Sequence, residues 1–372
     1  MSDPHLPPEI LDHILDLLHD RPEALKVCCL VSKSWVPRAR RHLFVNIWFH
    51  SMGRLESWRK IFPDPANSPA HHTNTLSIGS PQVAIAANEG AGSWIQAFSR
   101  VASLNMCCSL GQDLNVSLAP FLKFSPTLKS LRTHSIVLPC PHLFNLICSS
   151  PLLEDLTLTG EDRDNPHRPQ TVVPSTSPAF TGSLELSLFG GMGSTARRLL
   201  DLPNGVHFRR LTLSLTCVED LRWTMELVAR CSGTLECLDV KYYLHGTSVS
   251  ILCWSYNLPL YVDETSPVFI DLSKAAKLQD VIFRLRTLTV DIEWITLTLQ
   301  TVTPDLRQIS IQLSYDFAAG QTIGDPTLGL WLDLDRLLSN IDLYSKLRTD
   351  IYNVSQGPDS FGFVEGAGEI LP

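Results

Sequence analysis

The sequence predicts an α/β protein in which a small helical module, over about residues 4–45, precedes an irregular solenoid of strand–helix units. Two observations predict this architecture. Apolar residues spaced by three and four mark three short helices within the first 45 positions. Beyond them an alternating leucine pattern recurs, mostly every 25 to 30 residues, with helical stretches between its copies. Such repetition is typical of a solenoid, because one unit cannot bury its apolar face alone and a stacked neighbour covers it.

The composition indicates a soluble folded protein. Hydrophobic residues make up 44% and charged residues 18% of the 372 positions. The net charge of −8 disfavours nucleic acid and anionic membranes as partners. The sequence has neither a run of eighteen apolar residues nor the basic and apolar segments of a secretory signal at residues 1–5. Most of the ten cysteines lie inside apolar runs, as reduced core residues do, so we expect a cytoplasmic or nuclear protein.

The first 45 residues predict three helices in a thin bundle. The first begins near Pro8, where a proline at the first turn costs no hydrogen bond, and ends near His19. The second follows Pro22, and the third carries Trp35 and Leu43. The apolar stripes of such short helices exceed what their own core can bury. Modules of this kind are usually stabilised by docking on another surface.

Four short motifs in this module resemble an F-box of the basidiomycete type, abundant in mushroom-type fungi. They are Leu6–Leu11 (LPPEIL), Ile14–Leu15, Cys29–Trp35 (CLVSKSW) and Arg41–Phe44 (RHLF). The resemblance implies docking on a Skp-type adaptor, which connects to a cullin and a RING protein. By position, it implies adaptor contacts at Leu6, Pro7, Ile10, Leu11, Ile14, Leu18, Leu25, Val31 and Trp35.

This sequence departs from the F-box pattern at one place, the start of the second helix. Many members have an Asp-Leu pair there, and this chain has Glu23-Ala24-Leu25. The alternative interpretation of the module is an N-terminal helical cap with ordinary core leucines.

Residues 46–97 are predicted to be a linker and transitional segment, because Pro63, Pro65 and Pro69 mark a loop. The solenoid is predicted over 98–350. The central apolar positions of its strands are Leu104, Leu131, Leu156, Leu186, Leu211, Leu238, Val281 and Ile309. Helical patterns lie between them at 142–149, 223–231 and 294–302.

The period of this pattern resembles that of degenerate leucine-rich repeats. The resemblance implies an irregular horseshoe arc with parallel strands on its concave face and helices outside. The alternative is a two-layer α/β domain. The longest step, from Leu238 to Val281, contains the aromatic-rich segment 244–267, which indicates an insertion or an irregular repeat. That segment either contacts a partner or seals its own loop against the core. A flexible glycine-rich tail is expected over 351–372.

The neighbours of the strand leucines are predicted to line the concave face and to bind a target protein. They are polar and mixed in sign, which suits hydrogen bonding to a protein and offers no chemistry for a small molecule. These candidates are Arg132, Asp155, Thr157, Glu185, Thr212, Asp239, Lys241, Asp280, Arg284, Gln308 and Gln312.

No catalytic, cofactor or metal site is predicted. The glycine run at Gly190–Ser194 lacks the lysine of a phosphate loop and is interpreted as a turn between repeats. The motifs G-x-S-x-G, H-E-x-x-H and paired C-x-x-C do not occur. The sequence therefore predicts a non-catalytic substrate-recognition subunit of a Skp–cullin–F-box (SCF) type ubiquitin ligase. The alternative is a scaffold or regulatory repeat protein that does not direct ubiquitination.

Overall fold

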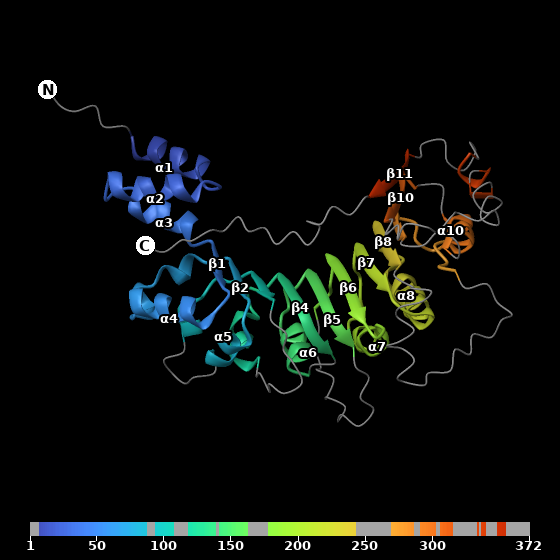
Figure 1. The fold of residues 1–372 in the computed structure, drawn as a ribbon, viewed down its shortest axis with the longest axis horizontal. Coiled ribbons are helices and arrows are strands. Elements are labelled where there is room, and N and C mark those ends of the chain that lie inside the picture. The colour runs from blue at the N-terminus through green and yellow to red at the C-terminus, as the bar shows by residue number, and fades with distance from the viewer. Residues whose placement is uncertain are drawn as a thin grey trace, which may run out of the picture. The chain divides into compact units, whose positions relative to one another are not determined.

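The chain forms two compact units with parallel strands and helices (Figure 1). The computed structural model describes residues 7–87, 94–107, 118–138, 141–162, 178–242, 269–285, 291–302, 306–314, 333–334, 336–339 and 348–354. The first unit comprises Met1–Phe180 with Leu202–Asn204, and the second comprises Thr181–Asp201 with Gly205–Pro372. The predicted α/β class is confirmed. The aromatic-rich segment 244–267, with both interpretations given for it, lies outside the described residues.

The N-terminal module of the first unit consists of α1 (Pro8–Leu17), α2 (Pro22–Val31) and α3 (Val36–Leu43). A proline occupies the first turn of each helix, where its missing N–H is not needed. The module has a small core of its own, made of Leu15, Leu25, Cys28 and Ala39. A core of four residues leaves much of the apolar surface of three helices uncovered.

Five parallel strands of the first unit follow one another in chain order. They are β1 (Asn46–Phe49), β2 (Thr75–Ile78), β3 (Ser103–Met106), β4 (Ser130–Leu138) and β5 (Asp155–Asp162). Side chains at matching positions form one buried column across the strands: Ile47, Leu76, Leu104, Leu131 and Leu156. The strand positions predicted at 104, 131 and 156 are therefore in register.

The predicted linker at 46–97 contains strand–helix units. It holds β1, β2, α4 (Met52–Ile61) and α5 (Pro81–Ala86). Two of its prolines, Pro65 and Pro69, lie in the first turns of two 3-10 helices, η1 (Pro65–Asn67) and η2 (Pro69–His72). The side chains of Asp64 and Ser68 accept hydrogen bonds from the backbone there, at 2.9 and 3.2 Å. These prolines are therefore part of capped helical turns and do not separate two domains.

The remaining helices of the first unit are η3 (Trp94–Ala97), η4 (Ala119–Phe124) and α6 (Pro141–Cys148). Figure 1 shows α5 and α6 lying along one face of the strands. Aromatic rings fill the core under β1. Phe49 makes edge contacts with Trp58, Trp94 and Phe98, at ring-centroid distances of 5.8, 5.1 and 6.2 Å.

Six parallel strands of the second unit also follow chain order. They are β6 (Ser183–Phe189), β7 (Arg210–Leu215), β8 (Cys237–Tyr242), β9 (Asp280–Leu285), β10 (Gln308–Ser314) and β11 (Arg348–Val354). The helices α7 (Gly193–Leu200), α8 (Val218–Cys231) and α10 (Asp291–Gln300) lie between them in sequence. Because β11 extends to Val354, the predicted tail from residue 351 begins inside a strand, and 355–372 lies outside the described residues.

The register corrects one predicted strand position. Leu184 aligns with Leu211, Leu238, Val281 and Ile309, so the central position of β6 is two residues before the predicted Leu186. Leu184, Leu186 and Leu188 are all buried, which makes the alternation alone ambiguous. β8 pairs directly with β9, so the two strands on either side of the longest step are neighbours in the sheet.

Four threonines that precede strands join one repeat to the repeat before it. Thr73, Thr127, Thr234 and Thr301 donate a hydroxyl hydrogen bond to a carbonyl 26 to 31 residues earlier. The sequence analysis did not detect this spacing, because single threonines also occur at many other positions. It is a repeat signature that the structure reveals.

Candidate functional site

The N-terminal module exposes two rows of large apolar side chains. On α1, Ile10, Ile14 and Leu17 recur at spacings of four and three, and they are 41 to 64% exposed. On α2, Val27, Leu30 and Val31 recur at spacings of three and one, and they are 59 to 86% exposed. Exposed apolar patches of this kind are typical of interaction sites, which makes these two rows the candidate site of the module.

The predicted adaptor contacts differ in their exposure. Pro7, Ile10, Ile14 and Val31 are exposed, and Leu11 is half-buried. Leu18 and Trp35 are partly buried against the module core.

Leu25 corrects the predicted contact set. It is only 1% exposed because it fills the centre of the bundle, so its side chain holds the helices together. Leu6 lies outside the described residues. The prediction missed Leu17, Val27 and Leu30, although the helical spacing of Val27 and Leu30 was a usable signal.

An ionic clamp joins α1 to α3 on the same module. Asp16 accepts a hydrogen bond from Arg38 Nε at 2.7 Å, bonds Arg38 Nη2 as well, and lies 2.7 Å from His42 Nε2. Hydrogen bonds from Arg38, followed by His42, lower the pKa of the Asp16 carboxyl far below its ordinary value. The clamp fixes the angle between the two helices and therefore the position of the exposed row on α1.

Acid should weaken this clamp. The pKa of Asp16 is lower in the folded protein than in the unfolded chain. Its contribution to the free energy of unfolding is therefore complete at neutral pH and is lost as the pH falls below the ordinary carboxyl value of 3.8. We expect Asp16→Asn to be less stable than the wild type at pH 7, with the difference narrowing between about pH 4 and pH 2. Thermal unfolding of both proteins across that range is the measurement. A difference that stays constant with pH would show that Asp16 does not stabilise the fold through its charge.

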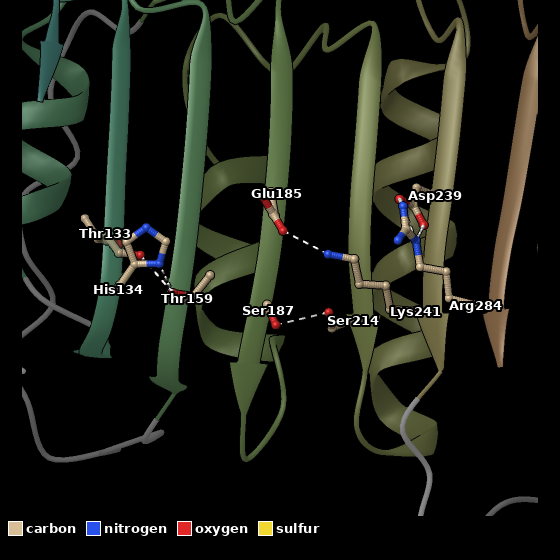
Figure 2. A network of polar contacts seen from close by, with 9 residues as sticks. All are labelled: Thr133, His134, Thr159, Glu185, Ser187, Ser214, Asp239, Lys241 and Arg284. Atoms are coloured by element: carbon tan, nitrogen blue, oxygen red, sulfur yellow. Dashed lines mark hydrogen bonds and ion pairs between the residues drawn. The ribbon is translucent and has the colours of Figure 1, made fainter. Parts of the chain in front are cut away.

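The second unit presents charged side chains on the sheet face opposite its helices, which we call its open face. Lys241 Nζ donates to Glu185 Oε1 at 2.9 Å, reaching from β8 over β7 to β6 (Figure 2). Arg284 contacts Asp239 through Nε at 2.9 and 3.1 Å and through Nη2 at 2.8 Å. Ser214 and Ser187 form a hydroxyl bond of 3.1 Å beside them.

These contacts change the interpretation of four predicted target-binding residues. Glu185, Asp239, Lys241 and Arg284 do lie on the open face, but they pair with one another across strands. Asp239 is only 6% exposed. The charges of these four residues are therefore compensated by one another. The remaining predicted residues on the second unit are half-buried. Thr212 aligns with Asp239, Gln308 with Asp280, and Gln312 with Arg284.

The open face of the first unit has a different character. Arg132 is exposed, and within the described part of the chain it makes no ion pair or side-chain hydrogen bond. The predicted residues Asp155 and Thr157 are half-buried on β5. Trp48 on β1 is 40% exposed on this face, and the sequence analysis missed it because it was assigned to the predicted linker.

The glycine run after β6 forms a turn, as predicted. Gly191 has φ of +103°, and the buried carboxylate of Asp220 accepts hydrogen bonds from the N–H groups of Met192, Thr216 and Cys217 at 2.7, 2.8 and 3.1 Å. It also accepts from the Thr216 hydroxyl at 2.9 Å. A carboxylate in this position satisfies the donors that a phosphate would need and would repel an anion.

Cysteine thiols and other side chains of metal-ligating types occur among the described residues. These residues contain no group of three or more His, Cys, Asp or Glu arranged to hold a metal ion. Burial raises the pKa of the Cys217 and Cys231 thiols to about 12, which keeps both protonated at neutral pH. Among the described helices, none has the length and apolar character to cross a membrane. The chain matches no protein-family model, and no curated protein matches it either.

Proposed function

We propose that the chain is a substrate-recognition subunit of an SCF-type ubiquitin ligase. The N-terminal module is an F-box that docks on a Skp-type adaptor, and the repeats hold a target protein. The observation that carries the proposal is the pair of exposed apolar rows on α1 and α2, within a module whose motifs resemble an F-box. The chain supplies recognition, and ubiquitin transfer takes place on the other subunits.

The energy of docking comes from burying these rows. Fully burying a Leu, Ile or Val side chain contributes about 1.5 to 3 kcal/mol, at roughly 25 cal/mol per Å². Association entropy and side-chain ordering offset part of this gain. Six such side chains are exposed on the two helices, which is enough to support a stable complex. The clamp between Asp16 and Arg38 holds α1 in place before docking, which reduces the ordering cost.

The open faces of the repeats support the second half of the proposal. Their side chains are polar, lie in regular rows set by the parallel register, and belong to rigid strands. Such a surface suits hydrogen bonding with a protein segment. The described residues on these faces contain no group of three or more His, Cys, Asp or Glu that could hold a metal ion.

The test captures proteins from cells with the tagged full-length chain and with Leu30→Glu, a substitution at a side chain that is 86% exposed. We expect the adaptor, cullin and RING subunits to be captured by the wild type only. Proteins captured by both the wild type and Leu30→Glu should be degraded faster in cells that express the wild type. Half-lives are followed after protein synthesis is blocked, and mass spectrometry identifies the captured proteins.

Two results would contradict the proposal. If the wild type captures no Skp-type adaptor, the module is not an F-box. If the adaptor is captured but the half-lives of the shared partners are equal, the chain is a scaffold or regulatory binding protein that does not direct ubiquitination.

A further inference from the structure

We propose that the open face of the first unit binds a segment of the target that presents an acidic side chain to Arg132 and an apolar side chain to Trp48. The inference rests on the proposed function only in taking a protein segment as the ligand of the repeats. The ligand is thus a segment with an acidic and an apolar side chain, and its binding surface is the open face of the first unit.

Four register positions form one row across the first unit. Trp48, Ser77, Asn105 and Arg132 align in consecutive parallel strands β1 to β4. Neighbouring strands lie about 4.8 Å apart, so Trp48 and Arg132 are separated by roughly 14 Å at their backbones. An extended peptide advances about 3.4 Å per residue, so a segment crossing the strands would place its two anchors about four residues apart.

The two central residues of the row, Ser77 and Asn105, have polar side chains. The Asn105 amide Nδ2 donates to Ser77 Oγ at 3.1 Å, and both side chains are half-buried. They form a small hydrogen-bonded pair between two larger, more exposed side chains. Trp48 and Arg132 are therefore the groups that a crossing segment meets first.

Charge complementarity selects the acidic anchor. Arg132 is exposed, and among the described residues no carboxylate pairs with it, whereas Lys241 and Arg284 on the second unit are paired with Glu185 and Asp239. On β5, Asp155 aligns with Ser130 and not with Arg132. A guanidinium in this state can bind a carboxylate through two parallel hydrogen bonds.

The apolar anchor is held rigidly. The ring of Trp48 packs against His50 with centroids 5.3 Å apart. A Cβ added at Gly79 would lie 3.1 Å from Trp48 Nε1, so the glycine allows the indole to pack closely over the end of β2. Tryptophan and arginine are the side chains that most often dominate binding energy at interfaces, and a pre-positioned indole loses little entropy on contact.

The test pans a phage-displayed library of random dodecapeptides on the purified full-length chain. We expect enrichment of peptides with an apolar residue and an acidic residue about four positions apart. A representative peptide is then synthesised and its affinity measured by fluorescence polarisation. Trp48→Ala and Arg132→Glu should each weaken binding roughly tenfold or more. A peptide with lysine in place of its acidic residue should bind Arg132→Glu better than it binds the wild type.

Arg230→Glu is the matched control, because Arg230 is an exposed arginine of α8 and its substitution changes the charge equally. Circular dichroism confirms that each variant is folded, and Trp48→Leu replaces Trp48→Ala if the latter is not. Three results would overturn the inference: no enrichment over an unrelated protein, enriched peptides without the acidic residue, or equal losses in Arg230→Glu and Arg132→Glu. Adaptor binding should be unchanged in all these variants, so failure here is distinguishable from failure of the proposed F-box.

Discussion

The double substitution Ile14→Glu/Leu30→Glu should lower the affinity for a Skp-type adaptor by at least about a hundredfold. Both side chains are exposed, 41% and 86%, and belong to the two apolar rows. A carboxylate forced into an apolar interface is desolvated without a partner, which costs several kcal/mol. Because neither residue contributes to the module core, the free energy of unfolding should change by only about 0.5 kcal/mol. Calorimetric titration with purified adaptor measures the affinity, and urea unfolding measures the stability.

A double variant on other helices and strands provides the control. Ile61→Glu/Phe189→Glu replaces two apolar side chains that are 47% and 71% exposed and lie outside the N-terminal module. It adds the same charge and should bind adaptor as the wild type does. Equal loss in the two double variants would mean that the added charge, and not the site, weakens binding. Unchanged binding in Ile14→Glu/Leu30→Glu would remove α1 and α2 from the interface.

Asp220→Ala should destabilise the second unit by about 3 kcal/mol or more. Asp220 is 1% exposed, and its carboxylate accepts three backbone N–H bonds and one hydroxyl bond. Alanine would leave the N–H groups of Met192, Thr216 and Cys217 without this acceptor. These donors join the turn after β6 to the start of α8, so both elements would loosen together. Urea unfolding followed by circular dichroism gives the difference in free energy.

Glu219→Ala is the matched control for this effect. Glu219 is the preceding residue in the first turn of α8, but its side chain is exposed. Its removal costs only a small favourable interaction with the helix dipole, about 0.3 to 1 kcal/mol. If the two variants were equally stable, the hydrogen bonds to Asp220 would not be important for the fold.

The regular elements of the fold could be predicted because their signals are local. Leu104, Leu131 and Leu156 recur at a near-constant spacing, and the structure places them in one buried column. By contrast, β1 and β2 have only four residues each, and their alternation includes the exposed Trp48 and the half-buried Ser77. Their pattern is too short to stand out, and prolines nearby favoured a linker interpretation.

The pairing of surface charges could not be predicted from the sequence. Glu185 and Lys241 are 56 residues apart and lie two strands from each other, so their contact depends on the register of three strands. Residue type alone could not distinguish these paired charges from Arg132. The sequence therefore identified the polar face of the repeats, and the structure was needed to separate its compensated part from the part that remains available.

The threonine hydroxyl bonds have a consequence for how the chain folds. Each one joins a strand–helix unit to the unit immediately before it, 26 to 31 residues earlier. Within each compact unit the strands also pair in the order in which they occur in the chain. Each new strand can therefore pair with the strand that precedes it in the chain, and no segment distant in sequence is needed first. Low contact order of this kind favours rapid folding by stepwise addition, in the direction in which the ribosome delivers the chain.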